Sequence, residues 1–232
     1  IIAAGAVLLE LGTLTWGQSE LYREPEDIWQ YALNYDPHSW FAAEQVGLCE
    51  LQAKDADGAE KYEELAYTLT NGNNFLTDAN LGYLYITKYN NYPAAISLLE
   101  KSVKLNPYQA YNIYSLATFY EKLGEMDKAK TLLDYGMKLM PREPLLHRTM
   151  GEYDARIGQI DAAIEEFRTA LSYKPDDLDV MYELAFILAK TGHQNDAIDV
   201  CQQALGIDPE AANIIQLYKS LMAQNQPEPV LQ

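Results

Sequence analysis

The sequence predicts an all-α protein, an array of antiparallel helix pairs with about five repeats and capping helices. A period of 34 residues carries this prediction, and four prolines mark it: Pro107, Pro141, Pro175 and Pro209. Small residues keep the same period at three further positions. They are Ala95, Ala129, Ala163 and Ala197; Ser102, Gly136, Ala170 and Ala204; and Gly124, Gly158 and Gly192. No run of alternating apolar and polar residues between turn signals, the pattern of a strand, interrupts this period.

Each unit reads as two helices joined by a turn. A first run ends in glycine, a short break follows, and an alanine opens the second run. A bulky residue then follows that alanine at a fixed spacing: Leu99, Leu133, Phe167 and Cys201. Small residues let neighbouring helices approach closely, glycine supplies the turn, and proline stops the second helix. Because one helix pair cannot bury its apolar face alone, we expect the units to stack.

This pattern resembles the tetratricopeptide repeat, which places small residues, aromatic residues, glycine and proline in the same order. The resemblance covers residues 24–224. It implies a right-handed superhelix whose concave face is lined by the first helix of each unit. Three positions depart from the family's pattern: Asp154 replaces an aromatic residue, Cys201 a bulky ring, and Asp78 or a neighbour a large residue. We expect looser packing at these three positions.

The first part of the repeat region fits the pattern with more exceptions. Glu26 to Tyr35, followed by Pro37, is expected to form a lone second helix. Residues 40–73 fit one repeat. Its small residues are Gly47, Ala59 and Ala66, and Asn71 stands where proline is usual.

The remaining units follow in order. Residues 75–107 carry Asn80, Leu81 and Gly82 and then Tyr85, but their internal turn at residues 89–92 has one residue more than the period allows. Residues 110–141, 144–175 and 178–209 are expected to be three further repeats, residues 210–224 a closing helix, and residues 225–232 a flexible tail.

The charge of the chain limits its partners. The formal net charge is −17, which argues against binding to nucleic acid because no basic stripe could displace counterions from phosphates. Such a charge usually solvates the outer face, and a preference for basic partners is the alternative. Cys49 and Cys201 lie in distant units, so we expect no disulfide and interpret both as small buried hydrophobic residues.

An apolar segment precedes the repeats, in residues 1–23. It runs from Ile1 to Trp16 and is followed by Tyr22 and Arg23, an order typical of the end of a transmembrane helix at the membrane surface. Glu10 counts against this interpretation, since a carboxylate in the hydrocarbon region is costly. The alternatives are a hydrophobic helix that caps the first repeat, or a signal peptide, for which the basic leading region and cleavage site are missing.

A second resemblance concerns the passage from Leu14 to Trp40. It is rich in aromatic residues and ends in Asn34, Tyr35, Asp36 and Pro37 before Trp40. It is similar to the junction between the last membrane helix and the tetratricopeptide tail of multispanning glycosyltransferases of the protein O-mannosyltransferase type. This resemblance implies a membrane-associated chain with its repeats outside the cytoplasm, on the periplasmic side, tethered through residues 1–16. The alternatives are a free-standing cytoplasmic or periplasmic assembly factor and a scaffold that self-associates.

No group of residues in the repeats points to catalysis, to a metal site or to a cofactor. His38, His147 and His193 lie in different units without metal-ligand spacing. Asp55, Asp57 and Gly58 are interpreted as a turn between helices rather than a calcium loop. Asp176, Asp177 and Asp179 are expected at the start of a helix, where acidic side chains are favoured. We therefore expect this chain not to be an enzyme.

Function is expected on the concave face. The resemblance places a ligand groove there, lined by the first helix of each unit. The candidate groove residues are Tyr83, Tyr111, Tyr114, Glu121, Arg148, Glu152, Tyr182 and Phe186. Tyrosine rings are common anchors for peptides and also stack on sugars, so a protein or peptide ligand is expected, with a glycan or glycopeptide as the alternative. A clamp for a terminal carboxylate is not expected, because Arg148 has acidic neighbours in Glu121 and Glu152. Packing of some tyrosines between repeats is the competing interpretation.

Overall fold

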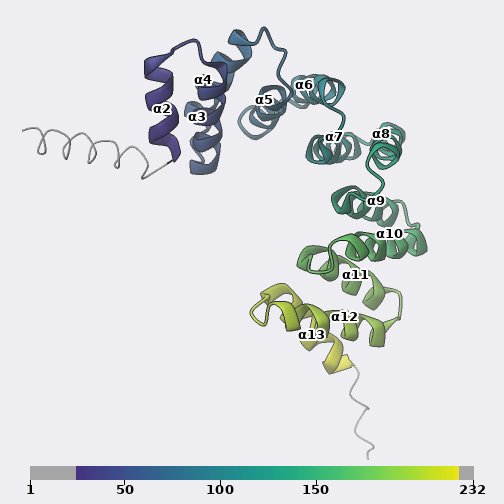
Figure 1. The fold of residues 1–232 in the computed structure, drawn as a ribbon. Coiled ribbons are helices and arrows are strands. Elements are labelled where there is room, and N and C mark those ends of the chain that lie inside the picture. Colours follow the sequence, from purple (N-terminus) through teal and green to yellow (C-terminus); the bar gives the residue numbers. More distant parts are fainter. Residues whose placement is uncertain (1–24, 225–232) are drawn as a thin grey trace, which may run out of the picture. The chain divides into compact units, whose positions relative to one another are not determined.

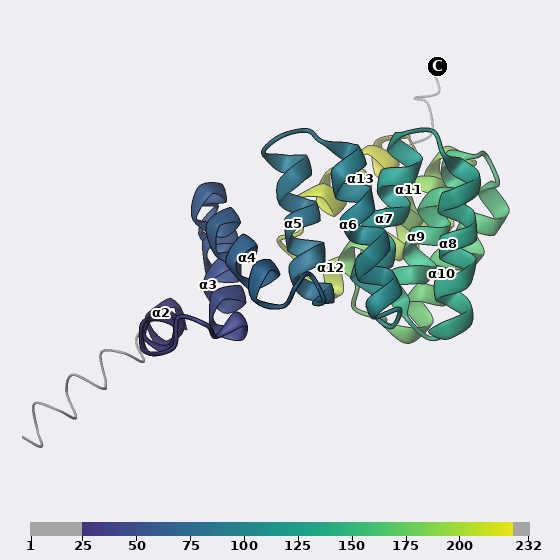
Figure 2. The same cartoon turned by 90° about the horizontal axis from the view of Figure 1, so that it is seen from above.

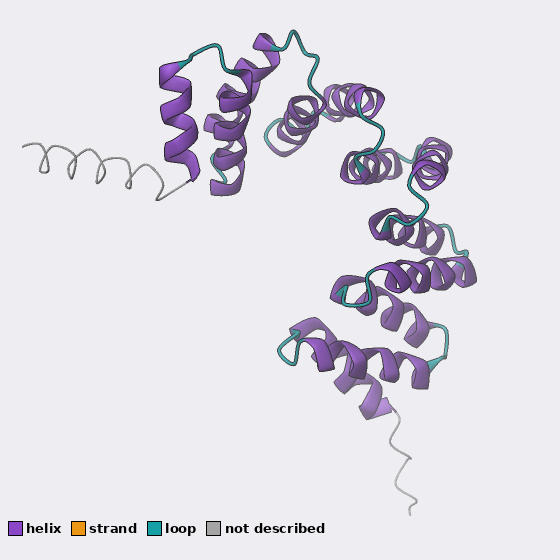
Figure 3. Ribbon diagram, viewed as in Figure 1, coloured by secondary structure: helices purple, strands orange, loops and turns teal. Residues whose placement is uncertain are grey.

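The computed structural model describes residues 25–224, and this part of the chain is helical throughout, without strands (Figures 1 and 3). The helices are α2 (Pro25–Tyr35), α3 (Trp40–Ala53), α4 (Ala56–Leu69), α5 (Phe75–Thr87), α6 (Tyr92–Leu105), α7 (Ala110–Lys122), α8 (Met126–Leu139), α9 (Pro144–Arg156), α10 (Ile160–Tyr173), α11 (Leu178–Lys190), α12 (Gln194–Ile207) and α13 (Ala212–Gln224). The predicted fold class, an all-α helical repeat array, is therefore confirmed.

Helices that follow one another along the chain pack in pairs. The pairs are α3 with α4, α5 with α6, α7 with α8, α9 with α10, and α11 with α12. Figure 2 shows the α5–α6 pair lying side by side. The lone helix α2 packs on α3, and α13 packs on α12 and α11. Each helix thus buries its apolar face against its predecessor or successor, as stacked repeats require.

The chain divides into two compact units, Ile1–Asn106 and Pro107–Gln232. Unit 1 contains α2 to α6 and unit 2 contains α7 to α13. The repeat period runs across this boundary, so the sequence pattern had not indicated the division. The membrane or cap segment expected in residues 1–23 and the tail expected in residues 225–232 lie outside the described residues. Among the described helices, none has both the length and the apolar character needed to cross a membrane.

The turns explain the repeated glycines. Gly124, Gly158 and Gly192 have φ values of 77°, 82° and 85°, in the left-handed region that favours glycine. The turn between α5 and α6 runs from Lys88 to Asn91 and is one residue longer than its three counterparts in unit 2, as the sequence predicts.

The core of unit 2 is apolar and continuous through its last helices. Phe167 and Leu184 lie in one cluster that extends from α10 to α13. A Cβ atom on Gly151 would lie 2.8 Å from the Phe167 ring, so the small residue at this position allows α9 and α10 to approach closely. Cys201 is 1% exposed within this cluster, and Asp154 is also buried.

Unit 1 has a smaller core that includes carboxyl groups. Glu44 is 1% exposed, and Glu63 and Asp78 are fully buried. Asp78 was expected to mark loose packing, but it is buried and forms an ion pair with Lys101 at 3.2 Å. The prediction that Cys49 is buried is wrong, because it is only half-buried. The buried positions of α3 are residues 42, 43, 44, 46 and 47, and at helical spacing Cys49 falls on the flank of that face.

Candidate functional site

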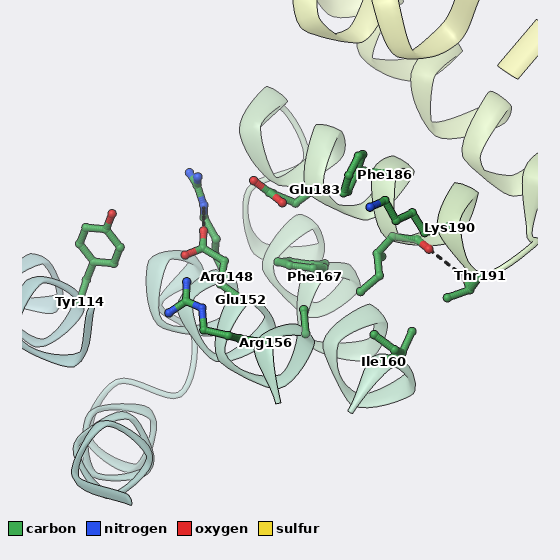
Figure 4. Close-up of a pocket in the computed structure, with 12 residues that line it drawn as sticks. Tyr114, Arg148, Glu152, Arg156, Ile160, Phe167, Glu183, Phe186, Lys190 and Thr191 are labelled. Carbon is green, nitrogen blue, oxygen red and sulfur yellow. Dashed lines mark hydrogen bonds and ion pairs between the residues drawn. The ribbon is translucent and has the colours of Figure 1, made fainter. Parts of the chain in front are cut away.

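A cavity of about 590 Å³ lies in unit 2 between α9, α10 and α11. Its lining residues are Tyr114, Arg148, Glu152, Ala155, Arg156, Ile160, Phe167, Glu183, Phe186, Ile187, Lys190 and Thr191. Figure 4 shows Arg148, Glu152 and Arg156 gathered on one side, with Phe186 and Lys190 across from them and Tyr114 set apart. The cavity therefore combines a polar wall with an aromatic one.

The polar wall is held by a network around Arg148. Its Nε donates to Glu152 Oε1 at 2.8 Å, and its Nη1 donates to Asp179 Oδ2 at 3.1 Å. Arg148 and Glu152 lie one turn apart on α9, whereas Asp179 belongs to the first turn of α11. This network links the two helices, so the guanidinium has a defined position before any ligand binds.

A second ion pair joins Arg156 of α9 to Glu121 of α7. The side chain of Glu121 is only 3% exposed, whereas that of Arg156 is 52% exposed. Glu121 therefore lies behind the arginine and does not line the cavity, although the sequence placed it in the groove. Its role in this arrangement is to position Arg156.

The aromatic wall is built on α11. Phe186 stacks on Tyr182 with a centroid distance of 6.1 Å, and the ammonium of Lys190 lies 4.7 Å from the centre of the Phe186 ring. Phe186 is 38% exposed, so its ring remains accessible to an apolar side chain. Tyr182 supports this ring and does not line the cavity itself.

Glu183 lies between the two walls and has no hydrogen bond or ion pair to the described residues. Burial raises the pKa of its carboxyl group, and the carboxylates of Glu152 and Asp179 raise it further, while Arg148 opposes the shift. A cation placed beside Glu183 would stabilise its ionised form. The cavity thus offers one carboxyl group that a basic ligand group could use.

Two predicted tyrosines lie away from the cavity. Tyr111 is 63% exposed on α7, where its ring packs on Tyr114 at a centroid distance of 5.8 Å. Tyr83 is exposed on α5, which belongs to unit 1. The structure therefore brings together Tyr114, Arg148, Glu152 and Phe186 from the predicted groove residues, with Tyr182 beneath them.

Sequence reasoning missed Arg156, Glu183 and Lys190. The signal that could have found them is helical spacing. Glu183, Phe186 and Lys190 follow one another at intervals of three and four residues on α11, and Arg148, Glu152 and Arg156 follow one another at intervals of four residues on α9. The groove residues were chosen by their position within the repeat, and this choice included only some of the residues on the exposed face of each first helix. Arg156, Glu183 and Lys190 lie on the same faces and were left out.

His147 connects structural elements of unit 2. Nδ1 of His147 lies 2.7 Å from Glu166 Oε2, and its Nε2 lies 3.1 Å from the carbonyl oxygen of Pro141, so this ring ties α9 to α10 and to the preceding turn.

The turn at Asp55 is a helix cap, as the sequence indicates, because the Asp55 side chain accepts hydrogen bonds from the backbone N–H groups of Asp57 and Gly58 at the start of α4. Within residues 25–224, no three His, Cys, Asp or Glu side chains gather in a way that could hold a metal ion.

Comparison with known proteins agrees with this architecture. The family model for the tetratricopeptide repeat matches residues 158–224. Protein FlbA of Caulobacter vibrioides is 29% identical over 118 residues, which cover 51% of this chain and 19% of FlbA. The chain spans a fifth or less of the length of the relatives that its sequence matches.

Solved structures share the fold at low identity. PilW, described as a widely conserved type IV pilus biogenesis factor, has a TM-score of 0.73 at 16% identity, and the match covers 88% of this chain and 94% of PilW. YrrB, described as a TPR protein with an unusual peptide-binding site, has a TM-score of 0.55 at 18% identity, over 82% of this chain and 97% of YrrB. Arrays of this fold provide extended surfaces for binding proteins, and the family is generally not catalytic.

Proposed function

We propose that this chain, which is a tetratricopeptide-repeat protein, binds an extended segment of a partner protein on the face of unit 2 formed by α9 and α11. The observation that carries this proposal is the cavity between these helices. It holds an accessible ring in Phe186, a half-buried carboxyl group in Glu183 and a preset guanidinium in Arg148.

The chemistry of the two walls indicates what the segment contains. An apolar side chain would pack on Phe186 and Ile187, and a basic side chain would reach Glu183. Tyr114 at the edge of the cavity would contact the next residue of the segment. Because the arginines of the cavity are already paired with carboxylates, they orient the ligand rather than capture a free anion.

A random peptide library displayed on phage tests this proposal. The wild type should enrich a set of peptides with an apolar and a basic residue, and the double variant Y114A/F186A should lose them. Aromatic anchors at the centre of an interface contribute about 2 kcal/mol, roughly thirtyfold in Kd. Tyr135→Ala is the matched control, since Tyr135 is 45% exposed on α8 and does not line the cavity.

The pH dependence of binding gives a second readout. Because the pKa of Glu183 is raised, its ionised fraction increases as the pH rises through that pKa, and affinity for a basic peptide should increase with it. Glu183→Gln should remove this pH dependence. The proposal fails if Y114A/F186A enriches the same peptides as the wild type, or if the wild type enriches none.

A glycan or glycopeptide is the alternative ligand, because tyrosine rings also stack on sugars. Comparing a selected peptide with the same peptide carrying an O-linked hexose separates the two. Tighter binding of the glycosylated form, lost in Y114A, would favour the glycopeptide. Equal binding would favour the peptide alone.

We further propose that the array is the tail of a membrane glycosyltransferase-like protein, outside the cytoplasm on the periplasmic side. The resemblance of residues 14–40 to such a junction and the apolar residues 1–16 support this. Chains of residues 1–232 and 24–232 should differ, with only the longer one found in membrane fractions. Recovery of both in the soluble fraction would favour a free-standing assembly factor, and a mass that rises with concentration would favour self-association.

A further inference from the structure

A second groove lies in unit 1, on helices that the proposed binding face does not use. Two adjoining cavities of about 670 Å³ and 450 Å³ share Glu64 of α4 and Tyr85 of α5. Their other lining residues come from α4, α5, α6 and the α5–α6 turn: Glu60, Tyr67, Thr68, Leu81, Tyr89, Asn90, Asn91, Pro93, Ala94, Ser97 and Leu98. We call this surface the α4–α6 groove.

The longer α5–α6 turn builds one end of the groove. Asn90 adopts a left-handed conformation with a φ of 52°, and Asn91 accepts the N–H of Ala94 at 3.3 Å to start α6. The hydroxyl of Tyr89 donates to Glu60 Oε2 at 2.8 Å. The extra residue, which the repeat period does not explain, therefore ties this turn to α4 and sets a tyrosine beside the groove.

Ammonium groups of the chain already lie on the rings at both ends. Lys88 Nζ is 5.2 Å from the centre of the Tyr89 ring and pairs with Asp57 and Glu60, each at 2.5 Å. Lys101 Nζ is 4.7 Å from the centre of the Tyr67 ring. The ends of the groove thus combine aromatic rings with cations, a favourable pairing.

The middle of the groove also combines an aromatic ring, that of Tyr85, with a carboxylate, that of Glu64, but no described ammonium or guanidinium group lies on this ring. The Tyr85 ring lies 5.9 Å from Tyr89 between centroids and packs on the buried cluster of Ala59, Leu81 and Leu84, which fixes its position. Glu64 is exposed on α4 and has no hydrogen bond or ion pair to the described residues. A ring and a carboxylate therefore line the same space, and among the described residues no lysine or arginine lines the two cavities with them.

We propose that the α4–α6 groove binds a basic segment of a partner protein, with a lysine or arginine side chain over Tyr85 and paired with Glu64. Charge complementarity selects this occupant, because the carboxylates of Glu60 and Glu64 line the groove and the chain carries a net charge of −17. The two lysines at its ends are held by carboxylates of the chain, so they do not repel a third cation strongly.

Fluorescence anisotropy with a labelled peptide of lysines separated by glycine and serine tests this proposal. The same peptide with glutamine in place of lysine is the ligand control. Glu64→Gln and Tyr85→Leu should each raise Kd roughly fivefold, because an exposed ion pair and a cation–π contact contribute about 1 kcal/mol each. The double variant should weaken binding roughly twentyfold.

Glu165→Gln is the matched charge control. It removes the same charge from an exposed position on α10, in the other unit. Equal loss of affinity in E165Q and E64Q would overturn the proposal, because the attraction would then reflect net charge alone. Wild-type affinity in E64Q would also overturn it. This outcome does not depend on the stability of Y85L, since Glu64 is an exposed surface residue.

Discussion

The two units bury polar groups in different ways. In unit 2 the buried carboxylate of Glu121 is paired with Arg156, and the buried hydroxyl of Thr149 donates to the carbonyl of Leu145 at 2.6 Å. In unit 1 neither carboxyl oxygen of Glu44 accepts a hydrogen bond, and Oε2 of Glu63 has no partner. Glu121 of unit 2 thus has a partner, whereas Glu44 and Glu63 of unit 1 keep buried carboxyl oxygens without one. Asp154 of unit 2 is also buried, and burial raises the pKa of its carboxyl group.

This difference predicts different stability and pH dependence. A buried carboxylate without partners is costly, so such groups stay protonated. Burial raises the pKa of Glu63 to about 8, and Glu44 adds to the rise while the amide of Asn80 opposes it. Burial also raises the pKa of Glu44. We therefore expect unit 1 to be the less stable unit at neutral pH, and unit 2 to provide the more rigid binding face.

The tryptophans make the comparison measurable. All three, Trp16, Trp29 and Trp40, lie in the part of the sequence assigned to unit 1, and the sequence from residue 107 onward contains none. Tryptophan fluorescence therefore follows unit 1, whereas far-ultraviolet circular dichroism follows the helices of both units.

The largest effect is expected for Phe167→Ala, which removes a fully buried ring from the core of unit 2. Phe-to-Ala changes in a core cost about 3–5 kcal/mol. Urea unfolding followed by circular dichroism should show this loss, with the tryptophan transition unchanged. A matching shift in tryptophan fluorescence would mean that the units unfold as one, and the comparison would lose its basis.

Glu63→Gln should stabilise unit 1. A group whose folded pKa is raised favours the folded state at low pH and loses that contribution as pH rises, here from about 4.5 to about 8. The free energy of unfolding should fall across this window in the wild type and less steeply in the variant. At pH 7 we expect the variant to be more stable by on the order of 2–3 kcal/mol.

Tryptophan-detected urea unfolding at a series of pH values measures this effect. Glu64→Gln is the control, because Glu64 is exposed on the same helix. The interpretation of unit 1 is wrong if E63Q is no more stable than the wild type at neutral pH, or if E64Q shows the same gain.

Arg156→Met tests the compensated carboxylate of unit 2. It leaves Glu121 buried without its partner, so the free energy of unfolding should fall by about 1–2 kcal/mol, with Arg168→Met on the exposed surface of α10 as control. Urea unfolding followed by circular dichroism at neutral pH measures the difference in the free energy of unfolding. Equal stability of the two variants would mean that the Glu121–Arg156 pair does not stabilise unit 2.

The smallest effect compares two glycines. Gly158→Ala should cost about 1 kcal/mol because its φ of 82° disfavours a side chain, although nothing lies within 4 Å of the added Cβ. Gly206→Ala meets equally open space within α12 and should stabilise by about 0.5–1 kcal/mol. Thermal unfolding should place the two variants on opposite sides of the wild type, and a shift in the same direction would contradict this explanation of the repeated turn glycines.

The sequence predicted the repeat array because prolines, glycines and alanines occupy fixed positions that sterics alone explain. It also identified the longer α5–α6 turn. It placed Tyr114, Arg148, Glu152 and Phe186 correctly on first helices of the repeats. It did not show which of the candidate groove residues surround a cavity, because that depends on contacts between helices, such as the ion pair of Arg148 with Asp179. The buried carboxyl groups of unit 1 and the burial of Glu121 depend on tertiary packing that a single residue position does not reveal.

Hydrogen exchange of the chain with and without a selected peptide tests the central claim most directly. Binding on the proposed face should protect the amides of α9 and α11 and leave those of unit 1 unchanged, and Y114A/F186A should show no protection at the same peptide concentration. Protection confined to other helices, or equal protection in the double variant, would contradict the account.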